Sequence, residues 1–483
     1  MSWNGNLVRL DENRWQIPSN YMEGMKTDAV IFANDSMVEQ IKADSAPQQV
    51  ANVACIPGIV GKSIAMPDIH LGYGFPIGGV AAVNVDDGFI SPGGIGFDIN
   101  CGVRLIRTDL LIEDISKNID NLMNELFKNI PSGLGSKGLV SINLREVEKV
   151  LMNGSEWAIE NGYGWEKDLE FTEESGKMLS ADSQFVSEKA RKRGLFQLGS
   201  LGSGNHFLEL DVVDKIFDED AAKVFGLKEG QVTITIHCGS RGCGYQIAAD
   251  YIQEMEHYVK ENNITIPDKQ LSCAPLESDI GNNYFSAMSC GANYAWANRQ
   301  LITHWIRKSF ENVMNNSSEN MGIDVVYDVA HNIAKKERHS VDGKATNVLV
   351  HRKGATRAFC AERPEVPMRY RTIGQPVIIP GDMVTGTYVL VGEKGAMNET
   401  FGSSCHGAGR KMSRKLAAES IDANSVKHAM MNDKIQFKIG NDSGIAEESP
   451  QAYKDVNQVV SVMCNSNLAH RVVKLKPIGV VKG

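Results

Sequence analysis

Apolar segments of strand length, each ending in a glycine-rich or polar cluster, are the feature that most limits the folds open to this chain. Residues 63–85, SIAMPDIHLGYGFPIGGVAAVNV, show the pattern first. From residue 231 onward it recurs in QVTITIHCGSRG, MGIDVVYDVAHN, TNVLVHRKGATRA and QPVIIPGDMVTGTYVLVG. Runs of this kind predict strands joined by tight turns, at which glycines let the backbone approach another group closely.

Segments with helical spacing or composition lie between these strands. Residues 284–314 contain no proline and predict one long, largely buried helix. Residues 28–44, DAVIFANDSMVEQIKAD, predict an amphipathic helix. Four further apolar residues recur at helical spacing and predict a surface helix with one buried stripe: Ile115, Ile119, Leu122 and Leu126.

The order of these elements favours one intertwined α+β unit over residues 1–483, with central mixed strands, glycine-rich loops and flanking helices. No internal repeat and no low-complexity linker divides the chain. Residues 131–195 combine a glycine-bearing loop with polar helices, so we expect an accessory helical lobe there.

Composition limits where the protein works and what it binds. No stretch approaches the roughly 20 apolar residues of a membrane span, and residues 1–15 lack the apolar run of a signal peptide, so we expect a cytoplasmic protein with no membrane partner. Nine scattered cysteines favour reduced thiols or metal ligands over disulfides. The net charge of −9 would repel RNA, so RNA binding would need a local basic site.

A group of histidines lies at the ends of apolar segments, beside Gly, Asn or Cys. Any one of them alone is most simply a buried histidine that bonds to the backbone. An acid and a thiol three residues apart in GGIGFDINCG, Asp98 and Cys101, could bind one ion together with these histidines. A metal site is therefore the better interpretation of the group. Neutral imidazoles, a carboxylate and a thiolate suit zinc, manganese or iron. The histidines are His206, His237, His331 and His406.

Basic residues stand beside the same glycine-rich loops, and their guanidinium and ammonium groups favour phosphate contacts. None of the loops matches the P-loop, because no GK[ST] follows at the required spacing. A phosphate site would therefore use exposed backbone N–H groups and these side chains. The basic residues are Arg241, Arg352, Lys353, Arg357, Arg410 and Arg414.

Seven motifs, DINCG, GSGNHFLE, HCGSRG, VAHN, HRKGATRA, CHGAGR and the terminal KPIGVVKG, together resemble the RtcB family of RNA ligases in its longer archaeal form. The resemblance runs in order from about residue 10 to residue 483. It implies a GTP- and manganese-dependent ligase that joins RNA 3′-phosphate or 2′,3′-cyclic phosphate ends to 5′-hydroxyl ends, in tRNA splicing or RNA repair. RNA is the implied partner, and archease is a candidate helper protein.

The resemblance also implies a reaction path. His406 would attack the α-phosphorus of GTP to form a covalent histidine–GMP, the RNA 3′-phosphate would take up the guanylate as RNA(3′)pp(5′)G, and the 5′-hydroxyl would displace GMP. Asp68 would assist that hydroxyl or a metal-bound water.

The same resemblance implies the binding residues, which fall into three sets. Two manganese ions, bridged by the Cys101 thiolate, would be held by Asp98, Cys101, His206, His237 and His331. The nucleotide would be held by Asn205, Phe207, Glu209, Asn332, Asp382, Thr387, Ala408, Tyr453 and Lys482. RNA phosphates would be held by Arg193, Arg241, Lys353 and Arg414.

One motif departs from the family. Where the family has a sequence close to PGSMGTxSY, this chain has PGDMVTGTYVL, with Asp382 in place of a hydroxyl, Val384 in place of glycine and Thr387 in place of serine. We expect an active ligase with an altered nucleotide pocket. Two alternatives are a metal-dependent phosphodiesterase or cyclic-phosphate hydrolase, and a non-catalytic RNA-binding paralogue. His406 argues against the first, and the retained metal ligands argue against the second.

Overall fold

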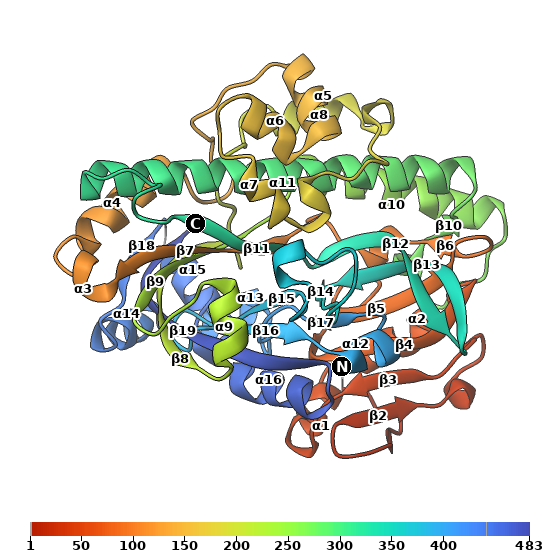
Figure 1. Cartoon of the computed structure of the whole chain (residues 1–483). Coiled ribbons are helices and arrows are strands. Elements are labelled where there is room, and N and C mark those ends of the chain that lie inside the picture. The colour runs from red at the N-terminus through yellow and green to blue at the C-terminus, as the bar shows by residue number, and fades with distance from the viewer. Residues whose placement is uncertain (1, 441) are drawn as a thin grey trace.

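The computed structural model describes residues 2–440 and 442–483. Two large sheets make up its lower part in Figure 1, and two long helices, α10 (Arg241–Glu261) and α11 (Asp279–Met314), lie side by side across the top of them. The helix predicted over residues 284–314 is therefore confirmed and starts earlier than predicted. Most of its residues between Tyr284 and Phe310 are buried, because it packs between the sheets and a further layer of helices.

The first sheet has seven strands in the order β1-β2-β3-β4-β5-β13-β12. β3 and β4 pair in parallel, and the other neighbours are antiparallel. The segment 63–85 forms most of the β4–β5 hairpin, as predicted. The strands are β1 (Val8–Arg9), β2 (Arg14–Ile17), β3 (Ala29–Phe32), β4 (Ile59–His70), β5 (Ile77–Asn84), β13 (Lys344–Lys353) and β12 (Asn332–Val341).

The second sheet has the order β11-β7-β9-β8-β19-β16-β15, and β18 pairs with β19 in parallel. Its strands from residue 231 onward include four that the sequence predicts, β9, β11 and the two strands of the β15–β16 hairpin. The strands are β11 (Asp324–Ala330), β7 (Gly102–Leu111), β9 (Gln231–Cys238), β8 (Phe207–Ile216), β19 (Ala469–Lys482), β16 (Thr387–Gly392), β15 (Pro376–Pro380) and β18 (Gln436–Ile439).

Short strands and helices complete the α+β architecture. Two small sheets pair β10 (Ala274–Pro275) with β6 (Phe89–Ile90), and β14 (Ala355–Arg357) with β17 (Ser403–Cys405). None of the described helices combines the length and apolar character needed to cross a bilayer. The remaining helices are α1 (Asp35–Lys42), α2 (Ala46–Val53), α3 (Ile112–Ile115), α4 (Ile119–Asn129), α5 (Leu144–Asn153), α6 (Ser155–Glu160), α7 (Lys167–Glu170), α8 (Glu188–Gly194), α9 (Glu219–Phe225), α12 (Lys394–Glu399), α13 (Arg414–Ser420), α14 (Ala423–Asn432), α15 (Asp442–Glu447) and α16 (Val456–Asn465).

Two helix predictions need correction. Residues 28–44 do not form one helix, because Ala29–Phe32 is strand β3 and only Asp35–Lys42 is helical. The four residues AVIF are buried on both faces between β2 and β4, and a short apolar run has no periodicity that separates strand from helix. The stripe that begins at Ile115 is also divided, since α3 ends at that residue and α4 starts at Ile119.

Helices α5, α6 and α8 lie on the side of α11 that faces away from the sheets (Figure 1), where they pack together and against α10 and α11. Residues 171–174 instead reach the second sheet, where Thr172 pairs with Asp328 and Glu173 accepts a hydrogen bond from the Ala330 backbone N–H at 2.9 Å. The segment predicted as an accessory lobe therefore contacts both α11 and the second sheet.

A buried ion cluster ties α11 to the second sheet. Asp328 on β11 accepts hydrogen bonds from Arg104 Nε at 2.7 Å and from Arg299 Nη2 at 2.8 Å, and none of these side chains is exposed. Arg299 Nη1 also donates to the carbonyls of Asn100 and Cys238, at 2.8 Å each. Those carbonyls adjoin two predicted metal ligands, so the cluster fixes the backbone that carries them.

Candidate active site

The five predicted metal ligands come together at one edge of the second sheet. Strands β11, β7, β9 and β8 are neighbours in that order. Pairing sets Gly102 beside both Ala330 and Cys238, and His237 beside Phe207. Four of the ligands lie at the end of one of these strands or directly outside it, and Asp98 lies in the turn that leads into β7, so all five meet at one edge. They are Asp98, Cys101, His206, His237 and His331.

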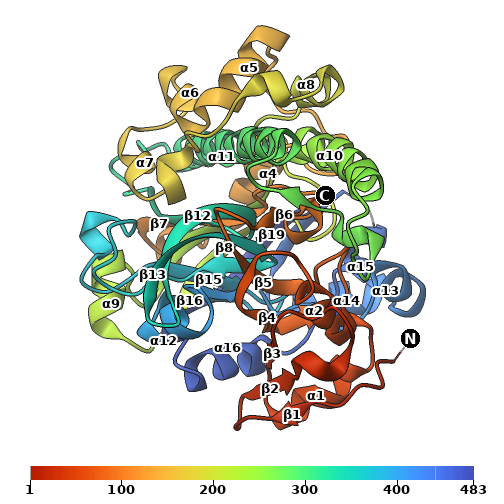
Figure 2. The same cartoon turned by 90° about the vertical axis from the view of Figure 1, so that its right-hand side faces the viewer.

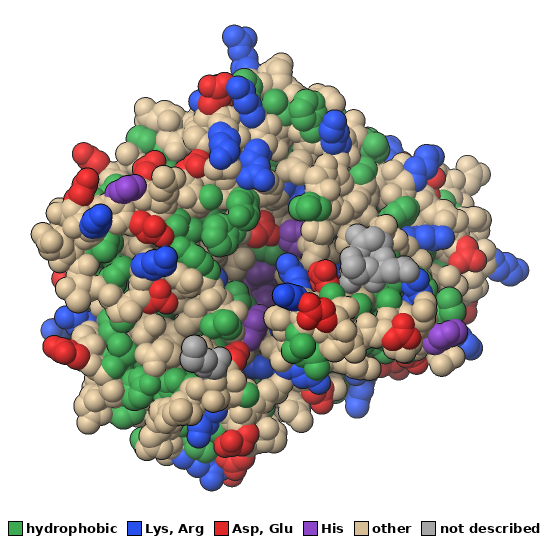
Figure 3. Space-filling view, turned by 180° about the vertical axis from the view of Figure 1, so that it is seen from behind, with side chains coloured by type: hydrophobic (Ala, Val, Ile, Leu, Met, Phe, Trp, Pro, Cys, Tyr) green, Lys and Arg blue, Asp and Glu red, His purple; other side chains and the backbone are tan. Residues whose placement is uncertain are grey.

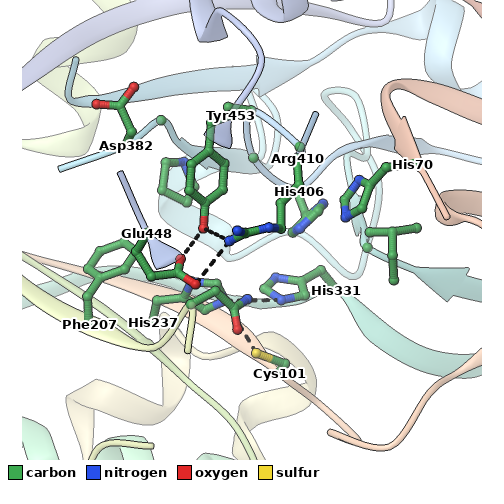
Figure 4. A pocket seen from close by; sticks show the side chains of 18 of the residues that line it. His70, Cys101, Phe207, His237, His331, Asp382, His406, Arg410, Glu448 and Tyr453 are labelled. Carbon is green, nitrogen blue, oxygen red and sulfur yellow. Dashed lines mark hydrogen bonds and ion pairs between the residues drawn. The ribbon is translucent and has the colours of Figure 1, made fainter. Parts of the chain in front are cut away.

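These ligands form two groups that share one sulfur atom. Cys101 Sγ lies 3.3 Å from His206 Nε2 and 3.3 Å from His237 Nε2. His237 Nε2 is 3.3 Å from His331 Nε2, and Asp98 Oδ2 is 2.8 Å from His206 Nε2. In each group of three the ligand atoms lie within 4.8 Å of one another, with Cys101 common to both. Figure 4 shows Cys101, His237 and His331 along one wall of the cavity.

The protonation states of these groups fit a metal centre. Burial lowers the pKa of His237 and of His331 well below the usual value, so both imidazoles are neutral, the form that binds metal. Burial raises the pKa of the Cys101 thiol to about 12. A thiolate at this position therefore requires the positive charge of a bound cation.

His406 lies beside the metal group and is held by a buried carboxylate. It follows β17, and Asp68 of β4 accepts hydrogen bonds from its backbone N–H at 3.1 Å and from its Nδ1 at 2.6 Å. Since Nδ1 carries the proton, Nε2 keeps its lone pair. The His331 ring centroid is 4.8 Å from that of His406. Asp68 therefore contacts the predicted nucleophile itself, a role that the sequence did not indicate.

A cavity extends from His406 away from the first sheet. Eight of the nine predicted nucleotide-binding residues line it together with the metal ligands Asp98, Cys101, His237 and His331. Thr387 does not, because it begins β16, and its buried hydroxyl has no hydrogen-bond partner among the described residues. The eight that line the cavity are Asn205, Phe207, Glu209, Asn332, Asp382, Ala408, Tyr453 and Lys482.

The carboxylate of Asp382 forms hydrogen bonds within its own turn. Its Oδ1 accepts hydrogen bonds from the backbone N–H groups of Val384 and Thr385 at 2.9 Å each, and Oδ2 accepts one from the Thr385 hydroxyl at 2.8 Å. In Figure 4 the Asp382 carboxylate points away from the cavity. The unusual acid therefore stabilises the turn that replaces the family's glycine and serine. Its residue still lines the cavity, and its charge contributes to the raised pKa of Glu209.

Glu209 is the acid that faces the cavity. Its residue is 3% exposed, and no hydrogen bond reaches its carboxylate from the residues that the structure describes. Burial, together with nearby Asp211, raises the pKa of Glu209 well above the usual value. A ligand with N–H donors would supply the hydrogen bonds that an ionised carboxylate needs here.

A groove with basic walls adjoins the metal group on the side of Asp98 and His206. Three of the four residues predicted to hold RNA phosphates line it: Arg193, Arg241 and Arg414. In Figure 3 histidine side chains are visible at the bottom of a hollow that has Lys and Arg on its rim. An acidic chain needs a local basic site to bind RNA, and this groove provides one.

Three predicted phosphate contacts are wrong because their side chains are buried elsewhere. The Lys353 ammonium is inside the fold and donates to the carbonyls of Tyr73 and Gly93. Arg352 pairs with Glu337, and Arg357 pairs with two buried or half-buried glutamates, Glu173 and Glu174. The alternation of side chains along β13 and β14 predicts the face of the strand on which a basic residue lies. It does not predict whether that face meets a binding site or an internal carboxylate.

Three titratable or charged residues line the cavity but were absent from the predicted catalytic, nucleotide, metal and RNA-binding residues: His70, Arg410 and Glu448. His70 is two residues after Asp68 on β4. Because side chains two residues apart on a strand share a face, the position of Asp68 could have predicted that His70 also lies at the site. Its Nδ1 lies 2.8 Å from the Asp68 carbonyl. The sequence indicated Arg410 only as a basic residue beside a glycine-rich loop. Glu448 lies in AEESPQ, which carries no motif that predicts a buried site.

Together these features define a candidate metal site of cysteine, histidine and aspartate side chains, which lies beside a histidine that a carboxylate orients and beside a groove with basic walls. The protein-family model described as "tRNA-splicing ligase RtcB" matches residues 49–483. The tRNA-splicing ligase RtcB of Methanococcus maripaludis is 54% identical over 477 residues, which cover 99% of both chains. The proteins of the same name from Thermococcus kodakarensis and Archaeoglobus fulgidus are 52% and 49% identical over 99% and 100% of this chain. The chain belongs to the RtcB family of tRNA-splicing ligases.

Proposed function

We propose that this family member is a GTP- and manganese-dependent ligase that joins RNA 3′-phosphate or 2′,3′-cyclic phosphate ends to 5′-hydroxyl ends. The observation that carries the proposal is the position of His406. Asp68 holds its Nδ1 at 2.6 Å, and the ring of the predicted metal ligand His331 lies 4.8 Å away. A neutral nucleophile oriented by a carboxylate and placed beside a metal is what nucleotide transfer to protein requires.

The ligand groups fit a pair of divalent ions. Cys101, His237 and His331 would hold one ion, and Asp98, Cys101 and His206 the other. Manganese is proposed from the family, because ligand type also suits zinc and iron. When bound, the ions neutralise phosphate charge and make phosphorus more open to attack.

The guanine would lie between the side chains at the far end of the cavity. Phe207 and Tyr453 offer aromatic faces, and Glu209 would accept from the guanine N1 and N2 hydrogens. Lys482 would donate to O6. Adenine has the reverse arrangement of donors and acceptors, so it leaves a buried carboxylate and a buried ammonium unpaired.

Four events follow from this arrangement. His406 Nε2 attacks the α-phosphorus of GTP, a P–N bond forms, and pyrophosphate leaves, while Asp68 keeps the proton on Nδ1. Any 2′,3′-cyclic end is hydrolysed to a 3′-phosphate. An oxygen of that phosphate displaces His406 and gives RNA(3′)pp(5′)G. The 5′-hydroxyl oxygen then attacks the RNA phosphorus, loses its proton and releases GMP, which leaves a phosphodiester bond.

RNA would approach along the basic groove. Arg193, Arg241 and Arg414 line it, and Asn205 belongs to both the groove and the nucleotide cavity. Tyr245 is 48% exposed and lies under the Arg193 guanidinium at 5.2 Å. A cationic groove with an exposed aromatic ring suits an unpaired RNA strand.

Covalent labelling tests the proposal most directly. The protein with manganese and α-labelled GTP should become labelled, and His406→Ala should not. A synthetic RNA that already carries the 3′-pp-5′-G end should still be joined to a 5′-hydroxyl RNA by His406→Ala without GTP. Label on His406→Ala would remove the histidine from its role. Unlabelled parent protein that opens 2′,3′-cyclic ends would favour the cyclic-phosphate hydrolase.

A further inference from the structure

Glu448 is a buried carboxylate on which the cationic side of the nucleotide cavity converges. The residue is 2% exposed. Its Oε1 lies 3.0 Å from Arg410 Nη1 and 3.4 Å from Arg414 Nε, and its Oε2 lies 3.7 Å from Lys482 Nζ. The Tyr453 hydroxyl donates to Oε2. Figure 4 shows Glu448, Tyr453 and Arg410 linked on one side of the cavity.

The surrounding cations keep Glu448 ionised. Burial would raise the pKa of Glu448, yet Lys482, Arg410 and Arg414 hold it below its usual value, so the carboxylate is ionised. An ionised Glu448 attracts all three cations and so limits where they can lie in the cavity wall. The Tyr453 ring is fixed as well, because Arg410 donates to its hydroxyl at 3.1 Å and lies 4.9 Å from its centroid.

Lys482 keeps unused hydrogen-bond donors. Its ammonium is 3.7 Å from Glu448, which is beyond hydrogen-bond range, and it lies 5.7 Å from the Phe207 ring centroid. No described residue accepts a hydrogen bond from it, although the residue is 2% exposed and lines the cavity. A buried ammonium with free donors beside an aromatic ring suits a carbonyl acceptor on a ligand.

We propose that Glu448 is a positioning residue for nucleotide choice, which holds the Lys482 ammonium and the Tyr453 ring where they meet the O6 edge of guanine. The inference rests on the proposed GTP function and deepens it. It divides base recognition between two carboxylates. Glu209 accepts directly from the N1 and N2 hydrogens, whereas Glu448 acts through Lys482 on O6.

Nucleoside monophosphates separate these two roles, because they bind at the same base site without reacting. IMP lacks the 2-amino group, and 6-thioguanosine monophosphate carries sulfur, a weak hydrogen-bond acceptor, in place of O6 while it keeps the N1 hydrogen and the 2-amino group. Their equilibrium affinities for the manganese-loaded full chain are compared with that of GMP by calorimetry. For Glu448→Gln, we expect the preference for GMP over 6-thioguanosine monophosphate to fall about tenfold, the value of one hydrogen bond to a charged group.

Matched variants make the result specific. Glu448→Gln should keep the preference for GMP over IMP, and Glu209→Gln should lose that preference instead. Glu419→Gln on the exposed face of α13 is the control and should change neither. Lys482→Met should lose the same O6 preference, and adding Glu448→Gln to it should cause no further loss, because both act on one contact.

Several outcomes overturn the proposal. Equal loss of both preferences in Glu448→Gln would mean that the residue supports only the shape of the cavity, and unchanged O6 preference would mean that Lys482 is positioned by other groups. If Glu448→Gln does not fold, an O6 preference retained by Lys482→Met refutes the inference. Failure of the parent chain to bind GMP would instead refute the proposed function.

Discussion

Replacing Asp68 by Asn is the most direct test of how the fold activates His406. Asp68 is fully buried on β4, and its Oδ2 accepts from both the backbone N–H and the Nδ1 of His406. The Lys454 ammonium donates to the carbonyls of Pro67 and Ile69, so the backbone on each side of Asp68 is held independently of its side chain. Asn has nearly the same shape, and the substitution chiefly removes the negative charge.

The size of the effect follows from that charge. Bonding of His406 Nε2 to phosphorus places positive charge on the ring, which the carboxylate of Asp68 stabilises through Nδ1. A hydrogen bond to a charged group contributes about 1.5–3 kcal/mol. At 1.36 kcal/mol for each factor of ten, the first step should slow roughly 10- to 150-fold.

The assay is single-turnover transfer of label from α-labelled GTP to the protein with saturating manganese. Asp87→Asn in the exposed turn between β5 and β6 is a matched control, and thermal melting of both variants shows whether folding is retained. Joining of a preactivated RNA should be much less affected, because that step does not use the guanylate on His406. A labelling rate for Asp68→Asn within threefold of the parent would refute the orienting role.

Three further predictions concern the metal, the altered turn and stability. Cys101→Ser should lose most bound manganese, measured by elemental analysis, because a hydroxyl does not bridge two ions at neutral pH as a thiolate does. Asp382→Asn should leave the KM for GTP in the labelling assay within threefold, since this carboxylate bonds to its own turn; a larger change would place its charge at the nucleotide. Asp328→Asn should lower stability by about 3–5 kcal/mol, measured by denaturation, because Arg104 and Arg299 stay buried without their counter-ion. Burial would raise the pKa of Asp328, but the two arginines hold it below its usual value, so this stabilisation is present near neutral pH and is lost as pH falls below the usual carboxyl range.

Local patterns in the sequence were sufficient for several strands, the long helix and the candidate metal ligands. Alternating or continuous apolar runs that end in glycine mark strand ends, and His237 and His331 stand at such ends. The proline-free segment 284–314 predicted α11 because the backbone hydrogen bonds of a helix join residues only four apart, so a helix can be recognised from local sequence. Family motifs then joined these positions into one predicted site.

The three-dimensional arrangement decided which charges face the site. Lys353 and Arg410 both follow apolar segments beside glycine, yet the first is buried among carbonyls and the second lines the cavity. Asp68 meets His406 across 338 residues of chain, and Glu448, in a segment without any motif, meets Lys482 from 34 residues away. Ion pairs and hydrogen bonds form between groups that packing brings within about 3 Å. Sequence periodicity fixes the side of an element on which a residue lies, and only the packing of the two sheets with their helices fixes its partner.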